Sequence, residues 1–426
     1  MDSNKYYDRK LYLKLFASLQ NRDYRLYYLS QLVSLNGTWM QTVAQSWLVY
    51  RLTESSTMLG IVTFSALIPV LLLTLPAGAL ADRVDQRKLL IAAHGLAALQ
   101  AIILAILTLT GLIQVWQIII MALLLGVIHA VEIPARHAFI AHSVPRDHLA
   151  NAIALNSSAF NVARFIGPAL AGWMVAQSSE GWVFVLNAVS YMVILFGFLR
   201  MRGDYQPEST TDEPTLTRII YALRYAHRHK AIRDVLLLVA AASVAQSGVS
   251  VLMPVFATGV YGGDSRTLGL LLGSLGAGAL AGAIRLAIYS SHTGQERTIV
   301  LSATVMGVSL LLFSQIESLL PGMLVLFIIG FCQSTQTASS NIAIQHIIPD
   351  SIRGRIMGLF SMVFIGLMPL GSLLSGLLAD WILLTNVTIM FGLVMIAAAV
   401  WYVSTQRNRD STSASENHSA VEDKRA

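Results

Sequence analysis

The 426-residue sequence has little charge, because only 12% of its residues are Asp, Glu, Lys or Arg while 55% are hydrophobic. A soluble domain carries about a quarter charged residues, so a water-soluble fold would lack the polar surface to cover itself. Cys332 is the only cysteine, which excludes a disulfide framework and a thiolate metal site. The sequence also lacks a phosphate-binding Gly-x-x-x-x-Gly-Lys-Ser/Thr loop and a Ser-His-Asp or metal-ligand spacing. We therefore expect no direct use of ATP, no enzymatic activity, no bound metal and no cofactor.

Long apolar blocks make up most of the chain. A block of roughly 18 or more residues with few charges predicts a membrane-spanning helix. The fold class predicted is an all-α membrane protein with twelve transmembrane helices. The expected spans are residues 26–50, 58–81, 89–109, 115–133, 150–176, 182–199, 235–261, 268–289, 298–313, 321–344, 356–378 and 388–403.

The basic residues indicate how these spans are oriented. All but three of the 29 lysines and arginines fall on one side of the layout: Arg51 and Arg266 fall on the other side, and Arg164 lies within a span. Cytoplasmic loops carry such an excess of Lys and Arg. We therefore expect an inner-membrane protein with both termini in the cytoplasm, and we interpret the net charge of +6 as a topology signal rather than as a nucleic-acid surface.

The spans divide the chain into five regions. We expect a cytoplasmic tail at 1–25, an N-terminal six-helix bundle at 26–200, a cytoplasmic central loop at 201–234, a C-terminal six-helix bundle at 235–404 and a disordered tail at 405–426. Within the loop, residues 206–214 are polar and proline-containing, which favours flexibility. Apolar residues then recur at helical spacing over 216–226, which predicts an amphipathic helix on the membrane surface.

The two predicted bundles resemble each other. Several residues recur at one constant offset, including His142 with His346, Pro145 with Pro349, Gly167 with Gly371, and Gly172 with Gly376. Duplicated halves are one construction of secondary transporters, which hold the substrate between the halves near the bilayer midplane.

The loop between the second and third spans carries the most specific motif, with Gly78, Leu80, Asp82, Arg83, Arg87 and Lys88 in order. It resembles the Gly-x-Leu-Ala-Asp-Arg-x-Gly-Arg-Arg-Lys motif of the major facilitator superfamily, from which Asp85 and Gln86 depart. The segments 132–139, 161–168 and 353–358 are similar to the exporter branch that includes enterobactin exporters and drug-efflux proteins. The resemblance implies two six-helix pseudo-symmetric bundles and export of a small molecule.

The motif predicts a conformational latch. Gly78 permits close helix approach, and Asp82 at a helix end can meet the positive N-terminus of another helix. The resemblance implies that this is the eleventh span and that the contact locks the outward-facing state. Arg83 or Arg87 could pair with Glu132, and we add Arg136 to the latch. The alternative is that these charges only flank a span.

Glu132 is the only acid near the membrane part of the fourth span, and His129 lies on the same helical face. A carboxylate near hydrocarbon is costly unless it is paired or protonated. Glu132 and His129 are therefore candidates for proton coupling. The alternative, which we favour, is a structural ion pair of Glu132 with Arg136 or with the 2–3 loop.

Arg164 is the deepest charge and shares a stripe of the fifth span with Asn161. An arginine there must face a cavity or a partner: an anionic substrate, Glu132, or backbone carbonyls. In the same span, Gly167, Pro168 and Gly172 resemble the helix-5 motif of antiporters, which implies a bend and tight packing.

Polar residues also follow the first, seventh and tenth spans, where the resemblance implies a cavity lining. Together with the fifth span, the candidates for the substrate cavity are Gln31, Thr38, Gln41, Gln45, Asn161, Arg164, Gln246, Gln333, Gln336 and Asn341. The alternative for each is hydrogen bonding between helices.

These observations favour a secondary active exporter that exchanges protons for a siderophore or a drug-like compound. The expected partners are the small-molecule substrate, protons and the lipid bilayer, with no nucleic acid, and the expected state is a monomer. The alternatives are a lysophospholipid or lipid flippase of the same fold and, from another class, a membrane-embedded enzyme.

Overall fold

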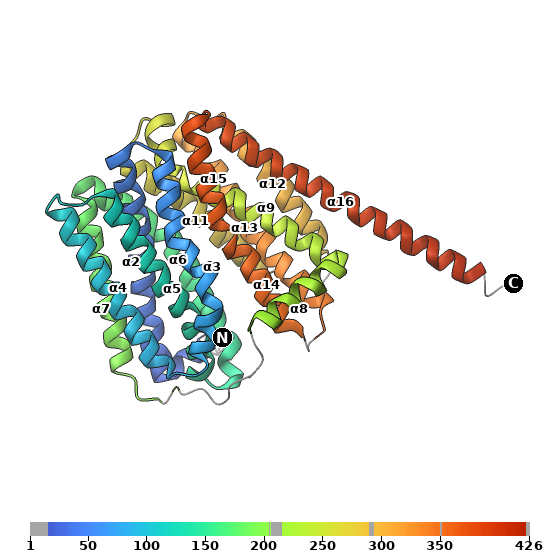
Figure 1. Ribbon diagram of the computed structural model, residues 1–426, viewed down its shortest axis with the longest axis horizontal. Helices are drawn as coiled ribbons and strands as arrows, with labels where there is room; N and C mark the ends of the chain where they lie inside the picture. The colour runs from blue at the N-terminus through green and yellow to red at the C-terminus, as the bar shows by residue number, and fades with distance from the viewer. Residues whose placement is uncertain (1–15, 204, 206–214, 289–293, 350–351, 423–426) are drawn as a thin grey trace, which may run out of the picture.

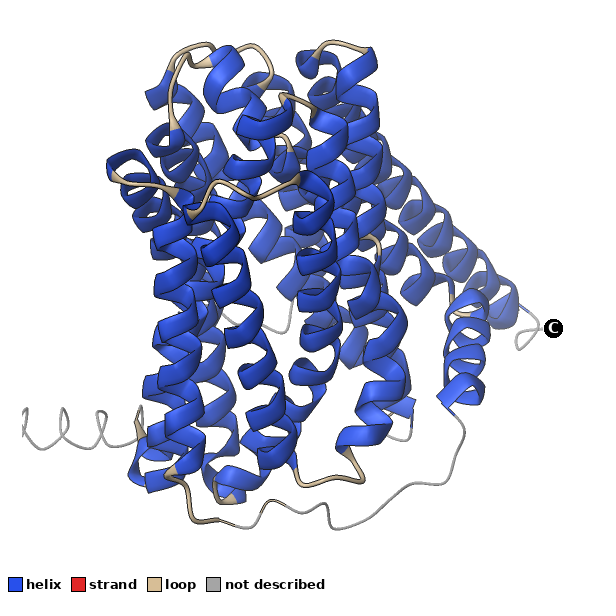
Figure 2. Cartoon of the chain, turned by 60° about the vertical axis from the view of Figure 1, so that its left-hand side comes forward, coloured by secondary structure: helices blue, strands red, loops and turns tan. Residues whose placement is uncertain are grey.

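The computed structural model describes residues 16–203, 205, 215–288, 294–349 and 352–422 (Figure 1). Within these ranges every regular element is a helix (Figure 2). Eleven helical segments among the described residues, with Arg353–Ala379 taken as one, are long and apolar enough to cross a membrane. The prediction of an all-α membrane protein is therefore confirmed. The polar segment 206–214 and most of the N-terminal tail lie outside the described residues.

The helices form two groups that lie side by side in Figure 1. The first group, here called the N-half, follows a short 3₁₀ turn at Ala17–Gln20 and consists of α2 (Arg22–Thr53), α3 (Ser56–Ala81), α4 (Gln86–Leu109), α5 (Val115–Ser143), α6 (Arg146–Gln177) and α7 (Glu180–Leu199). The second group, the C-half, consists of α9 (Lys230–Val251), α10 (Met253–Val255), η2 (Phe256–Val260), α11 (Ser265–Ile288), α12 (Gln295–Phe313), α13 (Leu319–Ile347), α14 (Arg353–Gly366), α15 (Met368–Trp381) and α16 (Leu384–Glu422). The helix α8 (Thr215–Arg228) connects the two groups.

Helix α2 is the twelfth membrane helix, although it is not among the eleven most apolar ones. Its hydropathy is lowered by polar residues such as Gln31, Gln41 and Gln45, which are only 3%, 1% and 8% exposed. The helix packs against α6 and α7 inside the N-half. Its polar side chains are thus covered by protein and not by lipid, which is why a polar helix is tolerated there.

Two spans that the sequence predicts as continuous are interrupted at prolines. The span at 356–378 is broken at Leu367, and Pro369 is the second residue of α15. The span at 235–261 is broken at Leu252, and Pro254 begins the next turn. Proline has no backbone N–H and clashes with the preceding turn, so each break lies where the regular hydrogen-bond ladder cannot continue.

The C-terminal tail differs from the expectation of disorder over 405–426. The structure continues α16 as one helix to Glu422, and Figure 1 shows it projecting away from the bundle. No glycine or proline occurs after Gly392, so the local sequence contains no strong helix breaker that would end the helix at residue 404.

The central helix α8 lies where the apolar periodicity predicts it. Ala222 and Ala226 are buried, and the helix packs against α9 and α14. Ile220 and Leu223 are 48% and 50% exposed. The helix thus packs one face on the C-half and leaves apolar side chains on another, as an amphipathic surface helix does.

The two halves contact each other mainly through two pairs of helices, α3 with α15 and α6 with α11. Each pair meets at glycines. A Cβ atom on Gly376 would lie 2.5 Å from the Ser56 carbonyl oxygen, and a Cβ on Gly172 would lie 2.8 Å from the Cα of Gly269. Only a residue without a side chain allows backbones to come this close. Gly172 and Gly376 are one of the residue pairs that recur at the constant offset between the halves. The same repeated glycine therefore lies at each of the two contacts.

Candidate functional site

The latch residues at the C-terminal end of α3 do not meet the C-half. Asp82 and Arg83 are exposed, and the Asp82 carboxylate makes no hydrogen bond or ion pair with any described residue. On α14 of the C-half, Gly354 and Gly358 also face open space, since a Cβ added there would meet nothing within 4 Å. A Cβ added at Gly78 would lie 3.8 Å from the Cβ of Pro134, in the same half. We call this end of the molecule the Asp82 end.

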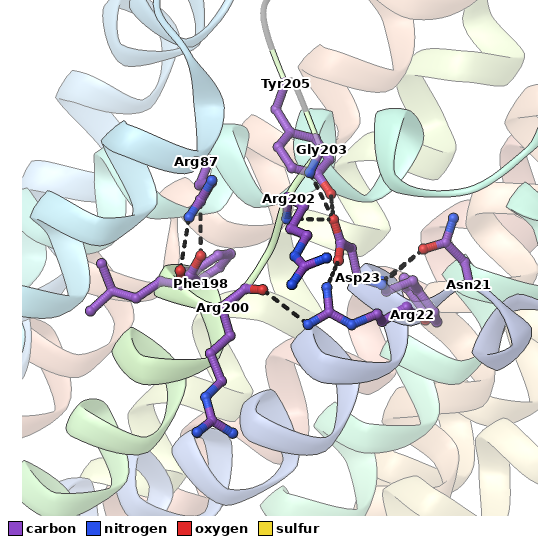
Figure 3. A network of polar contacts seen from close by, with 11 residues as sticks. Asn21, Arg22, Asp23, Arg87, Phe198, Arg200, Arg202, Gly203 and Tyr205 are labelled. Carbon is purple, nitrogen blue, oxygen red and sulfur yellow. Dashed lines mark hydrogen bonds and ion pairs between the residues drawn. The ribbon is translucent and has the colours of Figure 1, made fainter.

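Arg87 bonds within the N-half. Its side chain donates to the carbonyl oxygens of Phe198 at 2.8 Å and Leu199 at 3.1 Å, at the end of α7 (Figure 3). Asp85 accepts a hydrogen bond from the Arg87 backbone at 2.9 Å and so caps α4. Arg87 therefore joins α4 to α7, and the pairing with Glu132 that the sequence left open is not formed.

A second carboxylate ties the start of α2 to the chain that leaves α7. Asp23 accepts hydrogen bonds from the backbone N–H groups of Arg202 at 3.0 Å and Gly203 at 2.9 Å, and from the Tyr205 hydroxyl at 2.9 Å (Figure 3). Burial raises the pKa of Tyr205 well above its usual range, and the hydrogen bond to Asp23 adds to this rise. The hydroxyl thus stays protonated, so it remains a donor to the carboxylate.

Glu132 forms an ion pair with Arg136, one turn along α5, with 3.3 Å between the carboxylate and the guanidinium. Glu132 is only 7% exposed. It also lies close enough to His94 of α4 and to His129 to interact with them electrostatically. The group of acid, guanidinium and imidazoles is enclosed inside the N-half, because His94 is itself 4% exposed.

Arg164 joins the halves at one point. Its guanidinium donates to the Gln333 side-chain oxygen on α13 at 3.2 Å, and its carbon lies 6.0 Å from the ring centre of Trp39 on α2. Trp39 in turn packs edge-on against Phe160, with 5.6 Å between the ring centres. Of the three partners that the sequence left open for Arg164, neither Glu132 nor a backbone carbonyl is its partner in the described structure.

Two members of the polar series on α2 bond inside the N-half. Gln41 donates to Gln100 of α4 at 3.1 Å and accepts from Asn187 of α7 at 2.7 Å. The Thr38 and Tyr191 hydroxyls are 3.1 Å apart. These two candidates therefore make the interhelical hydrogen bonds that were the alternative to a cavity lining.

The other members of the series lie in different surroundings. The side-chain oxygens of Gln31, Gln246 and Gln336 are buried without a hydrogen-bond partner among the described residues. Asn161 donates to the carbonyl of Ser157 in its own helix. The remaining positions are Gln45, which is buried, and Asn341, which accepts from Gln345 at 2.5 Å.

The helix-5 motif lies at two contacts of α6. A Cβ on Gly167 would lie 3.3 Å from the carbonyl oxygen of Asn36 in α2, and Gly172 meets α11. Pro168 is buried within α6, which runs unbroken through it. The glycines thus allow close packing on both sides of this helix.

Sequence reasoning missed Asp380, near the end of α15. Its carboxylate accepts hydrogen bonds from the Ser55 hydroxyl at 2.9 Å, the Ser56 backbone at 2.9 Å and the Thr57 backbone at 3.0 Å. We call this end of the molecule the Asp380 end. A signal was present, because Gly376-Leu-Leu-Ala-Asp380 repeats the spacing of Gly78-Ala-Leu-Ala-Asp82. In both, a glycine lies one turn before an aspartate at a helix end.

Comparisons with known proteins agree with this architecture. The family described as transmembrane secretion effectors matches residues 14–424. The chain is 28% identical over 363 residues to the staphyloferrin A transporter of Staphylococcus aureus, covering 84% of this chain and 89% of the relative. It is 26% identical over 385 residues to the multidrug efflux pump Tap of Mycolicibacterium fortuitum, covering 88% and 93%.

Solved structures share the fold. A POT family transporter in complex with a thioalcohol-conjugated peptide has a TM-score of 0.72 at 13% identity, covering 91% of this chain and 96% of that one. A bacterial homologue of the lysosomal transporter Spinster has a TM-score of 0.70 at 13% identity, covering 91% and 97%. The chain therefore belongs to the transmembrane secretion effector family of the major facilitator superfamily, and it is a multi-pass membrane transporter and not an enzyme.

Proposed function

We propose that the protein is a proton-coupled exporter of a siderophore or drug-like molecule and works by alternating access. In this proposal the chain acts as a monomer in the inner membrane, with the Asp82 end and both termini in the cytoplasm. The one-sided distribution of lysine and arginine supports this orientation. Relatives named as a siderophore transporter and as a multidrug efflux pump support export.

The observation that carries the proposal is the unequal state of the two Gly-x-Leu-Ala-Asp segments. Asp380 of the C-half caps the N-terminus of α3, whereas Asp82 at the other end of α3 has no described partner. The same two halves are thus joined at one end and apart at the other. This is the arrangement expected of a transporter that is closed to the outside and open to the cytoplasm, where an exported substrate is loaded.

The opposite state follows from the same pair of segments. If the halves rock about their centre, the Asp380 contact opens and the Asp82 carboxylate approaches the N-terminus of α14, where the helix dipole favours negative charge. Arg87 would hold the 2–3 loop on α7 throughout, because its partners are in the N-half. We therefore assign Asp82 and Asp380 reciprocal roles in the two states, with Gly78 and Gly376 allowing the close approach.

The substrate pathway is proposed to run between the halves at the level of Arg164 and Gln333. These residues come from different halves and touch, so a molecule bound there would contact both. Proton coupling is proposed for the group around Glu132, since its carboxylate is buried and its charge is balanced by Arg136. Uptake of a proton by Glu132 would leave the Arg136 guanidinium without a charged partner. A buried charge without a partner destabilises the arrangement of the N-half that contains it.

Transport in cells tests the proposal. Accumulation of radiolabelled siderophores and of macrolide antibiotics would be compared in cells with and without the protein, each with and without a protonophore. We expect lower accumulation in cells that contain the protein, and loss of this difference with the protonophore. Equal accumulation with and without the protein would contradict export, and export that persists under the protonophore would contradict proton coupling.

A further inference from the structure

Arg164 is a cation within a membrane-spanning helix whose described hydrogen-bond partner is not an acid. Glu132 pairs with Arg136 at 3.3 Å, and at the Asp380 end Arg51 pairs with Glu180 at 2.8 Å. Arg164 lies in the middle of α6, and its described partner is the neutral side chain of Gln333. No described acidic side chain interacts with it. A membrane-embedded arginine is costly unless it is paired or reaches water, so this charge needs an explanation.

The neutral partner satisfies only a small part of the guanidinium. Arginine has five N–H donors in a planar fork, and the hydrogen bond to Gln333 uses one of them. A carboxylate or another oxyanion accepts two parallel hydrogen bonds from such a fork, and these charge-assisted bonds are stronger than neutral ones. The residue as a whole is partly exposed, and only one of its guanidinium nitrogens has a hydrogen-bond partner among the described residues.

Aromatic rings lie next to this cation. Phe160 precedes Arg164 by one turn of α6, so both side chains lie on one face of the helix. Phe160 is 42% exposed and packs edge-on against Trp39, which also lies beside the guanidinium. The guanidinium of Arg164 and the aromatic surface of Trp39 and Phe160 are therefore neighbours, so one small molecule could contact both.

Resting on the proposed function, we propose that Arg164 and Gln333 bind an oxyanion of the exported molecule while Trp39 and Phe160 contact its apolar part. The substrate class is an amphipathic organic anion. Because Gln333 belongs to the C-half and the other three residues to the N-half, the anion would bridge the two halves. An organic cation would instead meet an unpaired positive charge, which is repulsive.

Binding to the purified protein in detergent tests the charge preference. The probes are 2-naphthoate, its uncharged primary amide, and 2-naphthylmethylamine, which share the ring system and differ in charge. We expect the carboxylate to bind about tenfold more tightly than the amide, since charge-assisted hydrogen bonds to one guanidinium have about this effect, and the amine to bind most weakly. Equal binding of the three probes, or no saturable binding of the carboxylate, would overturn the proposal.

Two variants test the residues. Arg164→Gln removes the charge and should bring the carboxylate down to the affinity of the amide, while Arg164→Lys should keep part of the preference. Gln333→Glu leaves Arg164 in place and supplies an internal carboxylate, so it should also abolish the preference for 2-naphthoate. Arg266→Gln is the matched control, because Arg266 is exposed at the Asp380 end. Retained preference in Gln333→Glu and in Arg164→Gln would remove this site.

The binding test separates this inference from the function on which it rests. The charge preference is measured in detergent without a proton gradient, whereas export is measured in cells with a protonophore. Export of uncharged compounds only, together with equal binding of the three probes, would reject the anion site and leave the exporter. Anion binding without export from cells would reject the exporter.

Discussion

The carboxylate of Asp380 accepts a hydrogen bond from the backbone N–H of Ser56 at 2.9 Å, across the boundary between the two halves. The first N–H groups of a helix lack partners within it, and an aspartate that precedes the helix commonly supplies one. Here Ser55 caps α3 from its own chain end, and an aspartate from the C-half caps the same helix beside it. The bond therefore exists only while the Asp380 end is closed.

Replacing Asp380 by asparagine should weaken this closure. Asparagine keeps one acceptor oxygen but replaces the other by an NH₂ group, so hydrogen bonds that the carboxylate accepts are lost. Loss of one hydrogen bond costs about 1 kcal/mol, a roughly fivefold change in the balance between closed and open forms. Spin labels at Leu52 and Leu383, which are exposed at the Asp380 end and belong to different halves, would report the separation in a Cys332→Ser background. We expect a larger population of long distances in Asp380→Asn.

Asp264→Asn is the matched control for that variant. Asp264 accepts from the backbone of Arg266 at 2.9 Å and so caps its own helix, α11. Its loss should lower stability without separating the labels. A label distance that is unchanged in Asp380→Asn, or equally changed in Asp264→Asn, would show that the contact between the halves does not hold this end closed.

Acid should open the same end. Asp380 lies just beyond the apolar span that ends at Ala379. Burial alone would raise its pKa, but the hydrogen bonds from Thr57, Ser55 and Ser56 together lower it below the usual value of 3.8. A lowered pKa means that the ionised carboxylate stabilises the closed form. This stabilisation is fully present above pH 3.8 and is lost as the pH falls through the lowered pKa. We expect constant label distances from pH 8 to pH 5 and opening only below about pH 4. In Asp380→Asn this acid opening should be absent.

Adding a methyl group at the contact between α3 and α15 should force the helices apart. The Cβ of Gly376→Ala would lie 2.5 Å from the Ser56 carbonyl oxygen, a backbone atom. Overpacking of this kind costs about 1–3 kcal/mol, so the temperature of unfolding in detergent should fall. Gly358→Ala in the preceding helix is the control, since its Cβ would meet nothing within 4 Å and alanine favours helix. Equal effects of the two changes would contradict the role of the close approach.

Glu132→Gln should affect both stability and coupling. The variant leaves Arg136 buried without its carboxylate, which costs about 3–5 kcal/mol in buried pairs. The double variant Glu132→Gln/Arg136→Gln should recover part of this loss. If Glu132 carries the coupled proton, substrate export from proteoliposomes should proceed without proton movement in the variant.

Glu180→Gln is the control for Glu132→Gln. Glu180 is also buried and paired with an arginine, Arg51, but lies at the Asp380 end. It should lose stability and keep coupled proton movement. Full coupling in a folded Glu132→Gln protein would leave Glu132 with the structural role alone.

Tyr205→Phe should loosen the anchor between α2 and the chain after α7. The change removes the 2.9 Å hydrogen bond to Asp23 and keeps the two backbone bonds to the same carboxylate. Loss of one hydrogen bond costs about 1 kcal/mol. Asp23→Ala removes all three and should be clearly less stable in thermal unfolding. If both variants unfold at the native temperature, this network does not contribute to the stability of the N-half.

The sequence was sufficient for those features that depend on local composition. Apolar length predicts the spans because each helix must satisfy its own backbone in lipid, and the spacing of apolar residues predicted α8 in the right place. It was insufficient where tertiary contacts decide the outcome. Thr38 and Gln41 bond within the N-half, whereas Arg164 reaches across to Gln333. All of these positions are polar residues within membrane helices, and periodicity does not state which neighbour each will meet.

The amino-acid sequence by itself determined that the chain is a membrane protein built from two similar bundles. In the hydrocarbon of a bilayer the backbone must satisfy its own hydrogen bonds, which favours helices, and the repeat is visible in the order of the residues. Only the tertiary structure decided which of the two aspartates, Asp82 or Asp380, bonds to the opposite half. Asp82 and Asp380 both follow a Gly-x-Leu-Ala sequence and both are exposed, yet only the carboxylate of Asp380 caps a helix of the opposite half. The difference depends on how the halves are tilted against each other, and such a tilt is a property of packing between distant segments.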